Sequence, residues 1–236
     1  MTFGIQRLGP ADLGLLLDLQ EKIHAAQPDP DTFQRSTPEF LAYCLADGGR
    51  CYRAVHGDET VAYRIVYFPR ERPFNLAIDT TVPTAQYGTV AHFDTIGVLP
   101  DWRGHGLARR LNSRALTDLA DTGTRHILAT SAPTNPYGVR ALAEAGSRAI
   151  GVVEKFGGKL RLLFYRPYPQ AWPAAPATGA QPVAAARRHV ALVDTAALVD
   201  AFRQGWVGAG VRFAASGAAD LRMVRSCLPV SLRTYD

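Results

Sequence analysis

Apolar positions along the first two thirds of the chain recur with the periods of helices and of strands in turn. Leu13, Leu16 and Ile23 share one face of a period of about 3.6 residues, which predicts a helix that begins near Pro10. Runs rich in β-branched and aromatic residues predict strands instead. The expected strands are residues 3–8, 50–56, 60–68, 90–98, 125–131, 149–156 and 159–165, and further helices are expected at 36–47, 106–121 and 136–145.

Turn and cap residues mark the borders of these elements. The pairs 57–58 and 157–158 contain glycine and separate two strands each, which predicts hairpin turns. Ser36 and Glu39 have the spacing of a capping box, so we expect the second helix to begin there. Asn135, followed by a proline, predicts the start of a later helix. The resulting order, β-α-α-β-β-β-α-β-α-β-β, predicts an α/β domain.

The last third of the chain changes in composition. Residues 169–187 are rich in proline and alanine and predict a linker between a domain of residues 1–168 and a C-terminal extension of residues 188–236. A segment of about fifty residues rarely sustains a core of its own. We therefore expect the extension to pack on the domain or on a partner subunit. Its expected elements are a short helix capped by Asp194 or Thr195 and strands near 211–214 and 221–228.

Composition limits the class of protein. With 236 residues and 47% hydrophobic content, the chain can bury a full core. It has no apolar run of about 18 residues and no signal-peptide pattern at its start, so we expect no membrane association and a cytoplasmic location. The three cysteines, Cys44, Cys51 and Cys227, are too scattered for a disulfide framework or a zinc site. We expect core thiols and no metal ion.

The net charge of +5 comes mostly from arginine. The basic residues are dispersed, without a Lys/Arg run or an interleaved aromatic series, so the electrostatic signature of nucleic-acid binding is weak. We expect no nucleic-acid partner, and nucleic-acid binding is the less favoured alternative. A cofactor that carries several phosphate groups accounts equally well for part of the surplus charge.

The segment between the strand at 90–98 and the next helix points to a phosphate ligand. It contains Arg103, Gly104 and Gly106. Glycines let the backbone come close to a ligand. The unpaired amides of a first helical turn and the helix dipole both attract phosphate oxygens. The chain lacks Gly-Lys-Ser/Thr and an N-terminal Gly-x-Gly-x-x-Gly, which excludes two other phosphate-binding loops. The alternative is a structural turn with a solvated arginine.

This turn resembles the acyl-CoA-binding signature of the GNAT superfamily of N-acetyltransferases. In that signature an Arg or Gln is followed by two residues, a Gly, one residue, and a Gly or Ala. Arg103, Gly106 and Ala108 occupy those places, after a strand that ends in Val98. The order of elements over residues 1–168 is also similar to the GNAT fold, a mixed central sheet that splays after the fourth strand and is flanked by helices.

The resemblance also implies a cofactor and the residues that bind it. The implied cofactor is acetyl-CoA or another short acyl-CoA, with its thioester held by backbone amides of the fourth strand. The residues implied for cofactor binding are Ile96, Gly97, Val98, Arg103, Gly104, His105, Gly106, Leu107, Ala108 and Asn135.

Candidate catalytic residues lie on the same strand. Period-two alternation predicts that His92, Asp94, Ile96 and Val98 share one face. The resemblance implies a general base upstream of the pantetheine slot, and a carboxylate is unusual in mid-strand, so Asp94 is the main candidate and His92 the second. The alternative interpretation is a structural carboxylate satisfied by arginine or backbone donors, beside a hydrogen-bonded strand histidine.

The general acid is less well defined. Many members of the superfamily carry a tyrosine seven residues after the Asn that begins this helix, and Leu142 takes its place here. Tyr137 is the candidate substitute and Tyr165 a further one, because a phenol is a suitable acid toward a thiolate. Each can equally be a packing aromatic. Arg109 and Arg110 either approach nucleotide phosphates or stay solvated.

We therefore expect an N-acyltransferase that transfers an acetyl or other short acyl group from acyl-CoA to a primary amine of a small molecule or peptide, by direct attack in a ternary complex. No cysteine stands in a motif typical of a covalent acyl-enzyme. Residues 69–88, polar and rich in proline, are expected on the acceptor side. A homodimer is an alternative to a monomer. The other interpretation of the fold is a non-catalytic acyl-CoA-binding or regulatory module.

Overall fold

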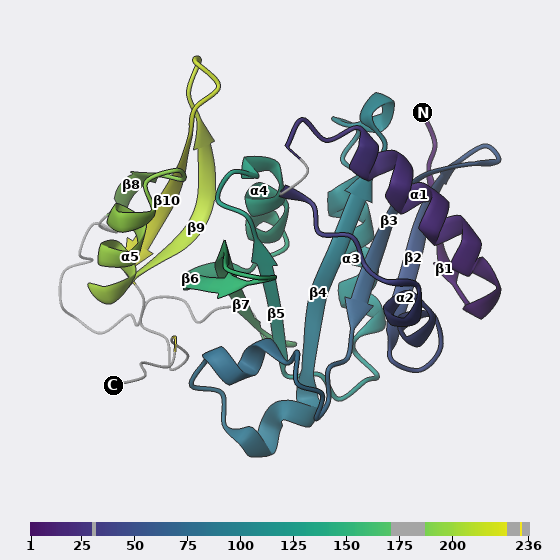
Figure 1. The fold of residues 1–236 in the computed structure, drawn as a ribbon, viewed down its shortest axis with the longest axis horizontal. Helices are drawn as coiled ribbons and strands as arrows, with labels where there is room; N and C mark the ends of the chain where they lie inside the picture. The colour runs from purple at the N-terminus through teal and green to yellow at the C-terminus, as the bar shows by residue number, and fades with distance from the viewer. Residues whose placement is uncertain (30–31, 171–186, 226–231, 233–236) are drawn as a thin grey trace. The chain divides into compact units, whose positions relative to one another are not determined.

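The computed structural model of the chain describes residues 1–29, 32–170, 187–225 and 232 (Figure 1). The chain forms two compact units. Unit 1 consists of Met1–Phe74 and Gly88–Thr124, and unit 2 consists of Asn75–Tyr87 and the described part of Arg125–Asp236.

Unit 1 is an antiparallel sheet with helices on both faces (Figure 1). Its elements are β1 (Gly4–Leu8), α1 (Leu13–Ala25), α2 (Pro38–Leu45), β2 (Gly49–His56), β3 (Glu59–Tyr67), β4 (Val90–Val98) and α3 (Leu107–Asp118). The strands pair in their order along the chain, β1-β2-β3-β4. The predicted hairpin turn at 57–58 connects β2 to β3, and Gly57 has the positive φ of 58° that such a tight turn requires.

The second helix is capped by Thr37, one residue after the predicted cap Ser36. The Thr37 side chain accepts a hydrogen bond from the backbone N–H of Phe40, at 3.3 Å. Ser36 is held instead by Gln20 of α1, whose side-chain amide donates to the Ser36 carbonyl and accepts from its N–H. The expected capping box of Ser36 and Glu39 is therefore wrong, because a tertiary contact fixes Ser36 outside the helix.

Each face of the sheet in unit 1 has its own hydrophobic core. Helices α1 and α2 pack on the face that carries Tyr63, Ile65 and Tyr67 of β3. Helix α3 packs on the other face and buries Leu107 and Leu111 (Figure 1). A strand that is buried on both faces is expected to be apolar throughout. One charged side chain in the middle of β3 departs from that rule.

Unit 2 contains the remaining strands in a second antiparallel arrangement. Its elements are β5 (His126–Ser131), α4 (Pro136–Glu144), β6 (Arg148–Lys155), β7 (Lys159–Pro167), β8 (Arg187–Ala191), α5 (Thr195–Arg203), β9 (Trp206–Phe213) and β10 (Ala219–Arg225). The strand order is β5-β7-β6-β9-β10-β8. The turn at 157–158 connects β6 to β7 as predicted, and Asp194 caps α5 by accepting from the N–H of Ala197 at 3.0 Å.

The C-terminal extension continues the sheet of unit 2. Strand β9 pairs with β6, with Gly208 opposite Ala149. A Cβ at Gly208 would lie 2.7 Å from Leu221 and 2.9 Å from Ala149, so only glycine allows this close approach. The extension thus packs on the same chain. Most of the predicted linker at 169–187 lies outside the described residues, as does Cys227, and the predicted domain borders stay predictions.

The segment predicted as a loop at 69–88 is mostly folded onto unit 2. It contains two short 3-10 helices, η3 (Leu76–Asp79) and η4 (Thr84–Thr89). An ion pair of 2.6 Å joins Asp79 to Lys155, at the end of β6. The side-chain oxygen of Gln86 accepts a hydrogen bond from His126 Nε2, at 2.6 Å. These two contacts attach the segment to β5 and β6.

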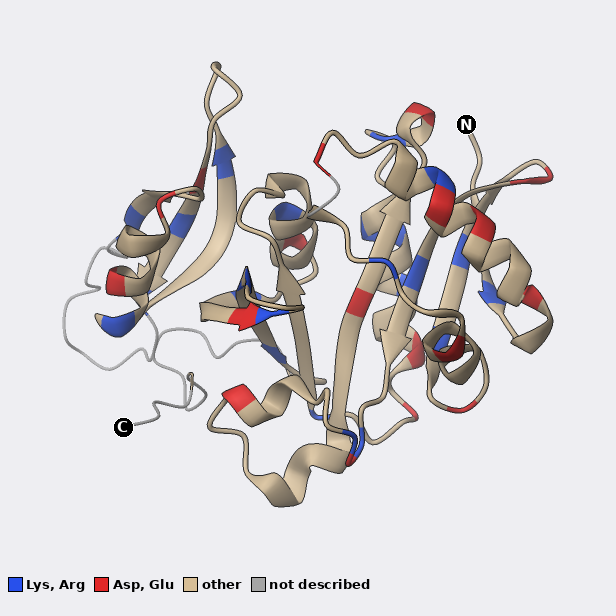
Figure 2. Ribbon diagram, viewed as in Figure 1, with Lys and Arg blue, Asp and Glu red and all other residues tan. Residues whose placement is uncertain are grey.

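Charged residues are interspersed rather than segregated. Figure 2 shows Lys and Arg positions spread over the helices and strands of each unit, with Asp and Glu positions among them. In the part of the chain that the structure describes, no helix is both long enough and apolar enough to cross a lipid bilayer.

Candidate functional site

The turn that precedes α3 is held open by two glycines. Gly104 and Gly106 have φ values of 82° and 71°, in the left-handed region that favours glycine. A Cβ at Gly104 would meet no atom within 4 Å, and a Cβ at Gly106 would meet only Arg109 Nη2, at 4.0 Å. The backbone at this turn is therefore accessible to a ligand and is not covered by packing within the described residues.

The chemistry of this turn suits an anion. Gly106 is the N-cap of α3 and has no side chain to satisfy the first amides of the helix, so those donors are free for a ligand. Arg103 and Arg109 are exposed around the turn and add positive charge, and the His105 side chain is exposed beside them. Leu107 differs from its neighbours because its side chain is buried and anchors the helix, so only its backbone faces the turn.

Strand β4, which leads to this turn, contains a β-bulge. Arg64 of β3 lies opposite Ile96, whereas Val66 lies opposite Phe93, so β4 has one residue more than β3 between these pairs. The extra residue falls at 94–95. A bulge leaves one residue out of the ladder and bends the strand. Backbone groups become available there, just before the stretch 96–98 that the resemblance implies for the thioester.

The bulge also changes which side chains share a face. His92 and Gly97 lie opposite Tyr67 and Tyr63, on the face covered by α1 and α2. Ile96 lies opposite Arg64, and Val98 follows Ile96 by two residues, so both are on the face covered by α3. The expectation that His92, Asp94, Ile96 and Val98 share one face is therefore wrong, because the extra residue reverses the alternation.

Gly97 has a packing role that sequence alone does not show. A Cβ at this position would lie 2.6 Å from the ring of Tyr63 and 2.7 Å from Ile23 of α1. Glycine therefore lets α1 approach the sheet. The predicted contact of Gly97 with a cofactor concerns only its backbone and stays a prediction.

Asp94 stands at the bulge and is accessible to solvent. It is the only charged residue of β4, which Figure 2 shows as a single acidic position within the strand. The Thr95 hydroxyl donates a hydrogen bond of 2.8 Å to its carboxylate. Desolvation by the surrounding protein raises the pKa of Asp94, whereas the Thr95 hydrogen bond and the charge of Arg64 lower it. A carboxyl whose pKa is raised is a better proton acceptor than an ordinary aspartate.

His92 is packed among aromatic rings. Its side chain is 4% exposed, and its ring centre lies 5.4 Å from that of Tyr67 in an edge contact. Tyr67 in turn contacts Phe40 and Tyr43 of α2. Of the two candidate bases, Asp94 is thus accessible and His92 is buried.

Unit 2 holds the other predicted site residues. Asn135 caps α4, and its side-chain oxygen accepts a hydrogen bond of 2.9 Å from the N–H of Gly138. Tyr137 is 72% exposed, and its ring centre lies 5.3 Å from that of Phe213 in β9. The phenol of Tyr137 is therefore free to act on a ligand, while its ring rests on the C-terminal extension.

The further candidate acid, Tyr165, is engaged elsewhere in unit 2. Its hydroxyl lies 3.1 Å from His126 Nδ1, and burial raises its pKa to about 12. Because the Gln86 carbonyl oxygen can only accept from Nε2, the Tyr165 hydroxyl donates to Nδ1. Leu142, at the place of the family's tyrosine, is buried.

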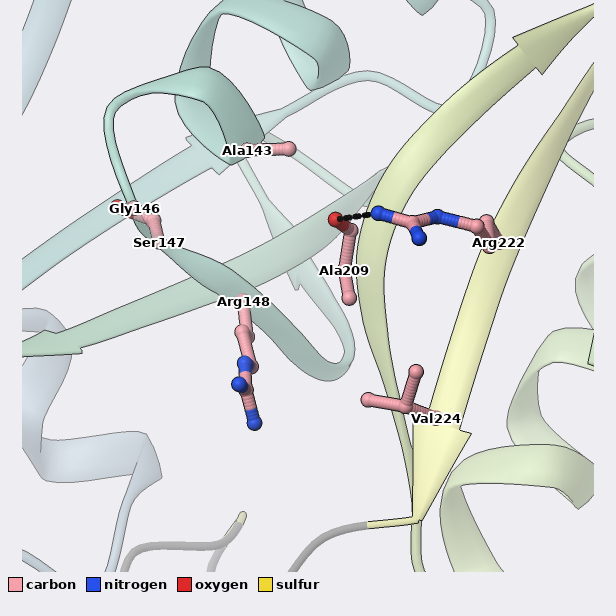
Figure 3. A pocket seen from close by; sticks show the side chains of 7 residues that line it. All are labelled: Ala143, Gly146, Ser147, Arg148, Ala209, Arg222 and Val224. Atoms are coloured by element: carbon pink, nitrogen blue, oxygen red, sulfur yellow. Dashed lines mark hydrogen bonds between the residues drawn. The ribbon is translucent and has the colours of Figure 1, made fainter. Parts of the chain in front are cut away.

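An open hollow of about 340 Å³ in unit 2 lies apart from these residues (Figure 3). Its lining consists of Ala143, Gly146, Ser147, Arg148, Ala209, Arg222 and Val224. The Arg222 guanidinium donates to the Ala209 carbonyl at 3.1 Å, and the Arg148 side chain points away from it. None of the predicted catalytic or cofactor-binding residues lines this hollow.

Sequence reasoning missed Arg64, the charged residue in the middle of β3. Its side chain is 1% exposed, and its guanidinium lies 4.1 Å from the centre of the Phe93 ring. A signal was present, since Arg64 stands within an otherwise apolar strand pattern from Val61 to Tyr67. Thr95 was also missed, and its role depends on a bulge that no residue type announces.

The donor set at the turn before α3 fits a phosphate-bearing cofactor. The site offers backbone amides and exposed guanidinium groups, and Gly104 and Gly106 leave open the space that a side chain would fill. Within the described ranges, no three His, Cys, Asp or Glu side chains lie close enough to hold a metal ion. Coenzyme A, with its diphosphate, is a ligand of the chemical class that the turn can hold.

The sequence matches the model of a known protein family. The model of the Acetyltransferase (GNAT) family matches residues 16–146, more than half of the chain. These residues include β4, the glycine turn and α3. No curated protein matches the sequence.

Solved structures with similar folds are acetyltransferases. Ribosomal-protein-S18-alanine N-acetyltransferase from Escherichia coli is 14% identical, with 74% of this chain and 99% of that chain covered and a TM-score of 0.54. NAA60 from Arabidopsis thaliana, in complex with acetyl-CoA, is 17% identical, with 72% and 100% covered and a TM-score of 0.56. An aminoglycoside acetyltransferase in complex with coenzyme A and kanamycin is 16% identical, with 71% and 95% covered and a TM-score of 0.50. At these identities the likeness shows the fold.

Proposed function

Because the chain belongs to the acetyltransferase (GNAT) family, we propose that it is an N-acyltransferase that transfers an acetyl or other short acyl group from acyl-CoA to a primary amine. The acceptor is a small molecule or a peptide. The amine attacks directly in a ternary complex, which requires no acyl-enzyme. The two free cysteines of the described residues are buried, in keeping with that route.

The observation that carries this proposal is the open glycine turn between β4 and α3. Two glycines with positive φ keep the backbone bare, and the first amides of α3 lack a capping side chain. Such amides bind phosphate oxygens, and Arg103 adds a bidentate donor at the turn. The family match covers the same residues.

Asp94, His92 and the bulged stretch of β4 belong to unit 1, and Tyr137 belongs to unit 2. Acetyl-CoA supplies the acyl group as a thioester. Backbone donors of the bulged stretch of β4 would hold the acyl oxygen, and the residue that the bulge leaves out of the ladder supports this role. Asp94 is accessible at the bulge and serves as the general base for the acceptor nitrogen, with His92 buried behind it as a supporting residue. Tyr137 is our candidate for the group that returns a proton to the departing thiolate.

The names of two similar proteins indicate the range of acceptors to test. One acts on the alanine of ribosomal protein S18, and another was solved with kanamycin. Purified protein would be mixed with acetyl-CoA and a panel that contains kanamycin, an alanine-terminated peptide and small diamines. We expect at least one amine to raise the release of free thiol well above the hydrolysis seen without amine.

A non-catalytic acyl-CoA-binding module is the second candidate, and one observation favours it. Leu142 is buried where many relatives carry a tyrosine, and Tyr165 is engaged by His126. The thiol assay separates the two candidates. Saturable binding of acetyl-CoA by calorimetry, with no amine-dependent thiol release, would favour the module.

The glycine turn can be tested with a matched pair of variants. Gly106→Val is expected to weaken acetyl-CoA binding at least tenfold, because the new side chain occupies the ligand's space. Gly57→Val is the control, since Gly57 also has a positive φ and open space around it but lies in the β2–β3 turn. Both changes strain the backbone by about 1–3 kcal/mol. Equal acetyl-CoA affinity of the two variants by calorimetry would refute the proposed cofactor site.

A further inference from the structure

Four aromatic rings of unit 1 lie in mutual contact beside the glycine turn, and they come from distant parts of the chain. The centres of the contacting rings are between 4.8 and 6.2 Å apart, within the range of favourable aromatic pairs. This ring cluster consists of Phe3 before β1, His56 at the end of β2, Trp102 at the end of the short helix Pro100–Trp102, and His105 in the turn itself.

The backbone on both sides of Phe3 is attached to β2. His56 Nδ1 donates a hydrogen bond of 3.1 Å to the Thr2 carbonyl, because a carbonyl can only accept. On the other side of Phe3, Gly4 begins the pairing of β1 with β2, opposite Val55. The Phe3 ring therefore has a defined place next to the turn, although it lies near the start of the chain.

The Phe3 side chain contacts both the glycine turn and the helix that follows it. Its ring centre lies 5.9 Å from that of His105, and the Arg110 guanidinium lies 5.7 Å from the Phe3 ring. Arg110 belongs to the first turn of α3, and its backbone N–H donates to the Gly106 carbonyl at 3.1 Å. A single side chain thus contacts the residues on both sides of Gly106.

The turn needs such support because its own residues supply little. Gly104 and Gly106 flank His105, and glycine loses more conformational freedom on ordering than any other residue. A Cβ at Gly104 would meet no atom within 4 Å, so packing among the described residues does not hold the turn there. The His105 side chain is exposed, yet its ring contacts those of Phe3 and Trp102. These contacts restrain the segment between the two glycines.

We propose that Phe3 is a positioning residue of the cofactor site, which holds the His105 ring and thereby fixes the glycine turn in its ligand-binding shape before a ligand arrives. The inference rests on the proposed function, because it assigns Phe3 to the binding of acyl-CoA. Ordering the turn in advance removes an entropy cost from binding. Phe3 acts through the His105 side chain, so the backbone amides stay free for phosphate oxygens. The family match begins at residue 16 and does not include Phe3.

The first test is the affinity for CoA, measured by calorimetry. Phe3→Ala is expected to weaken binding about fivefold, because the turn must then become ordered on binding. Phe3→Tyr keeps the ring and should bind CoA like the unmodified protein. In a His105→Ala background, Phe3→Ala should cause less than about twofold further loss, since the contact it removes is already absent. A full fivefold further loss there would overturn the inference.

Steady-state kinetics separate positioning from chemistry. With an amine that supports turnover, the KM for acetyl-CoA is expected to rise in Phe3→Ala by the same factor as the dissociation constant. The value of kcat should stay within about twofold, because Phe3 takes no part in the chemical step. A loss confined to kcat would contradict the proposed role.

Phe33→Ala is the matched control. Phe33 is a half-buried phenylalanine of the same unit, and its ring contacts that of His24 in α1, with centres 6.2 Å apart. Its loss is expected to lower thermal stability while the affinity for CoA stays within about twofold. An equal loss of affinity in both variants would show that binding reports general loosening of unit 1, and would overturn the inference.

A second measurement requires no ligand. From ¹⁵N relaxation, the order parameters of the Gly104 and Gly106 amides are expected to fall in Phe3→Ala from about 0.85 toward 0.6. Should Phe3→Ala fail to fold, His105→Ala, at an exposed position, must show the same fall. Unchanged order parameters would refute the inference. Absence of CoA binding by the unmodified protein, with the fall present, would refute the proposed function alone.

Discussion

Asp94 combines two properties that the other polar residues of β4 lack, since it is accessible and its pKa is raised by desolvation. Asp94→Asn is expected to reduce kcat about a hundredfold, because a general base typically contributes at least that factor. The affinity for acetyl-CoA should change little, since the glycine turn lies beyond the end of the strand. Stopped assays of thiol release and calorimetry measure the two quantities.

Asp101→Asn provides the comparison for that experiment. Asp101 is an exposed carboxylate in the short helix Pro100–Trp102, between β4 and the glycine turn. Its loss changes the net charge by the same amount but should leave kcat within about twofold, as exposed charges contribute little. A comparable loss of kcat in both variants would point to a general electrostatic effect and against Asp94 as the base.

Single residues were predicted with uneven success, for physical reasons. Asp94 could be singled out because a carboxylate is rare in a strand. Arg64 was overlooked although a guanidinium in an apolar strand is equally rare, because no ligand motif surrounds it. Asn135 was predicted both to begin α4 and to contact the cofactor. Its side chain caps α4, where this residue type is favoured for a structural reason, and the cofactor contact stays a prediction.

At the scale of elements, β4 shows where pattern reading fails. The strand itself was predicted with its observed bounds, 90–98, because this stretch is rich in apolar and β-branched residues. The alternation of its side chains was not, since the bulge at 94–95 inserts one residue and reverses the faces beyond it. Residue types carry no clear signal for a bulge without glycine, so the sequence of β4 does not reveal where its faces reverse.

The start of α2 offers a test of local structure. Thr37→Ala is expected to lower the free energy of unfolding by about 1 kcal/mol, because the Phe40 amide loses its cap. Ser36→Ala is the matched control, since Gln20 binds only the backbone of Ser36. It should cost less than about 0.5 kcal/mol. Urea denaturation gives both values, and the reverse order would restore Ser36 as the cap.

The folded segment 75–87 depends on a histidine that is buried in neutral form. Burial lowers the pKa of His126, whereas the unfolded chain binds a proton at about pH 6.5. The stability contributed by neutral His126 is therefore present above that pH and is lost as the pH falls below it. Protonation should break the contact with Tyr165, because protonated Nδ1 can no longer accept from its hydroxyl, whereas Nε2 still donates to Gln86.

The expected result is a shallower pH dependence of unfolding in His126→Gln. Urea midpoints at pH 7.5 and pH 5.5 should differ less in this variant than in the unmodified protein. His189→Gln, at an exposed position of β8, should retain the full difference. An unchanged difference in His126→Gln would assign the acid sensitivity to other groups.

For the whole molecule, the predicted fold class is confirmed by the family match and by the similar solved structures. Elements, their order and the glycine turn could be read from the sequence because each depends on local patterns. The division of the chain into two units could not, since residues 75–87 join unit 2 through contacts far along the chain.

The pairing of β9 with β6 has a consequence for truncated forms of this protein. A version that ends after residue 168 would contain the complete family match, yet β6 would lose the neighbour that meets it at Gly208. Its bare edge would then expose unpaired peptide groups that invite strands from other molecules. We therefore expect the shortened protein to aggregate more readily than the full chain.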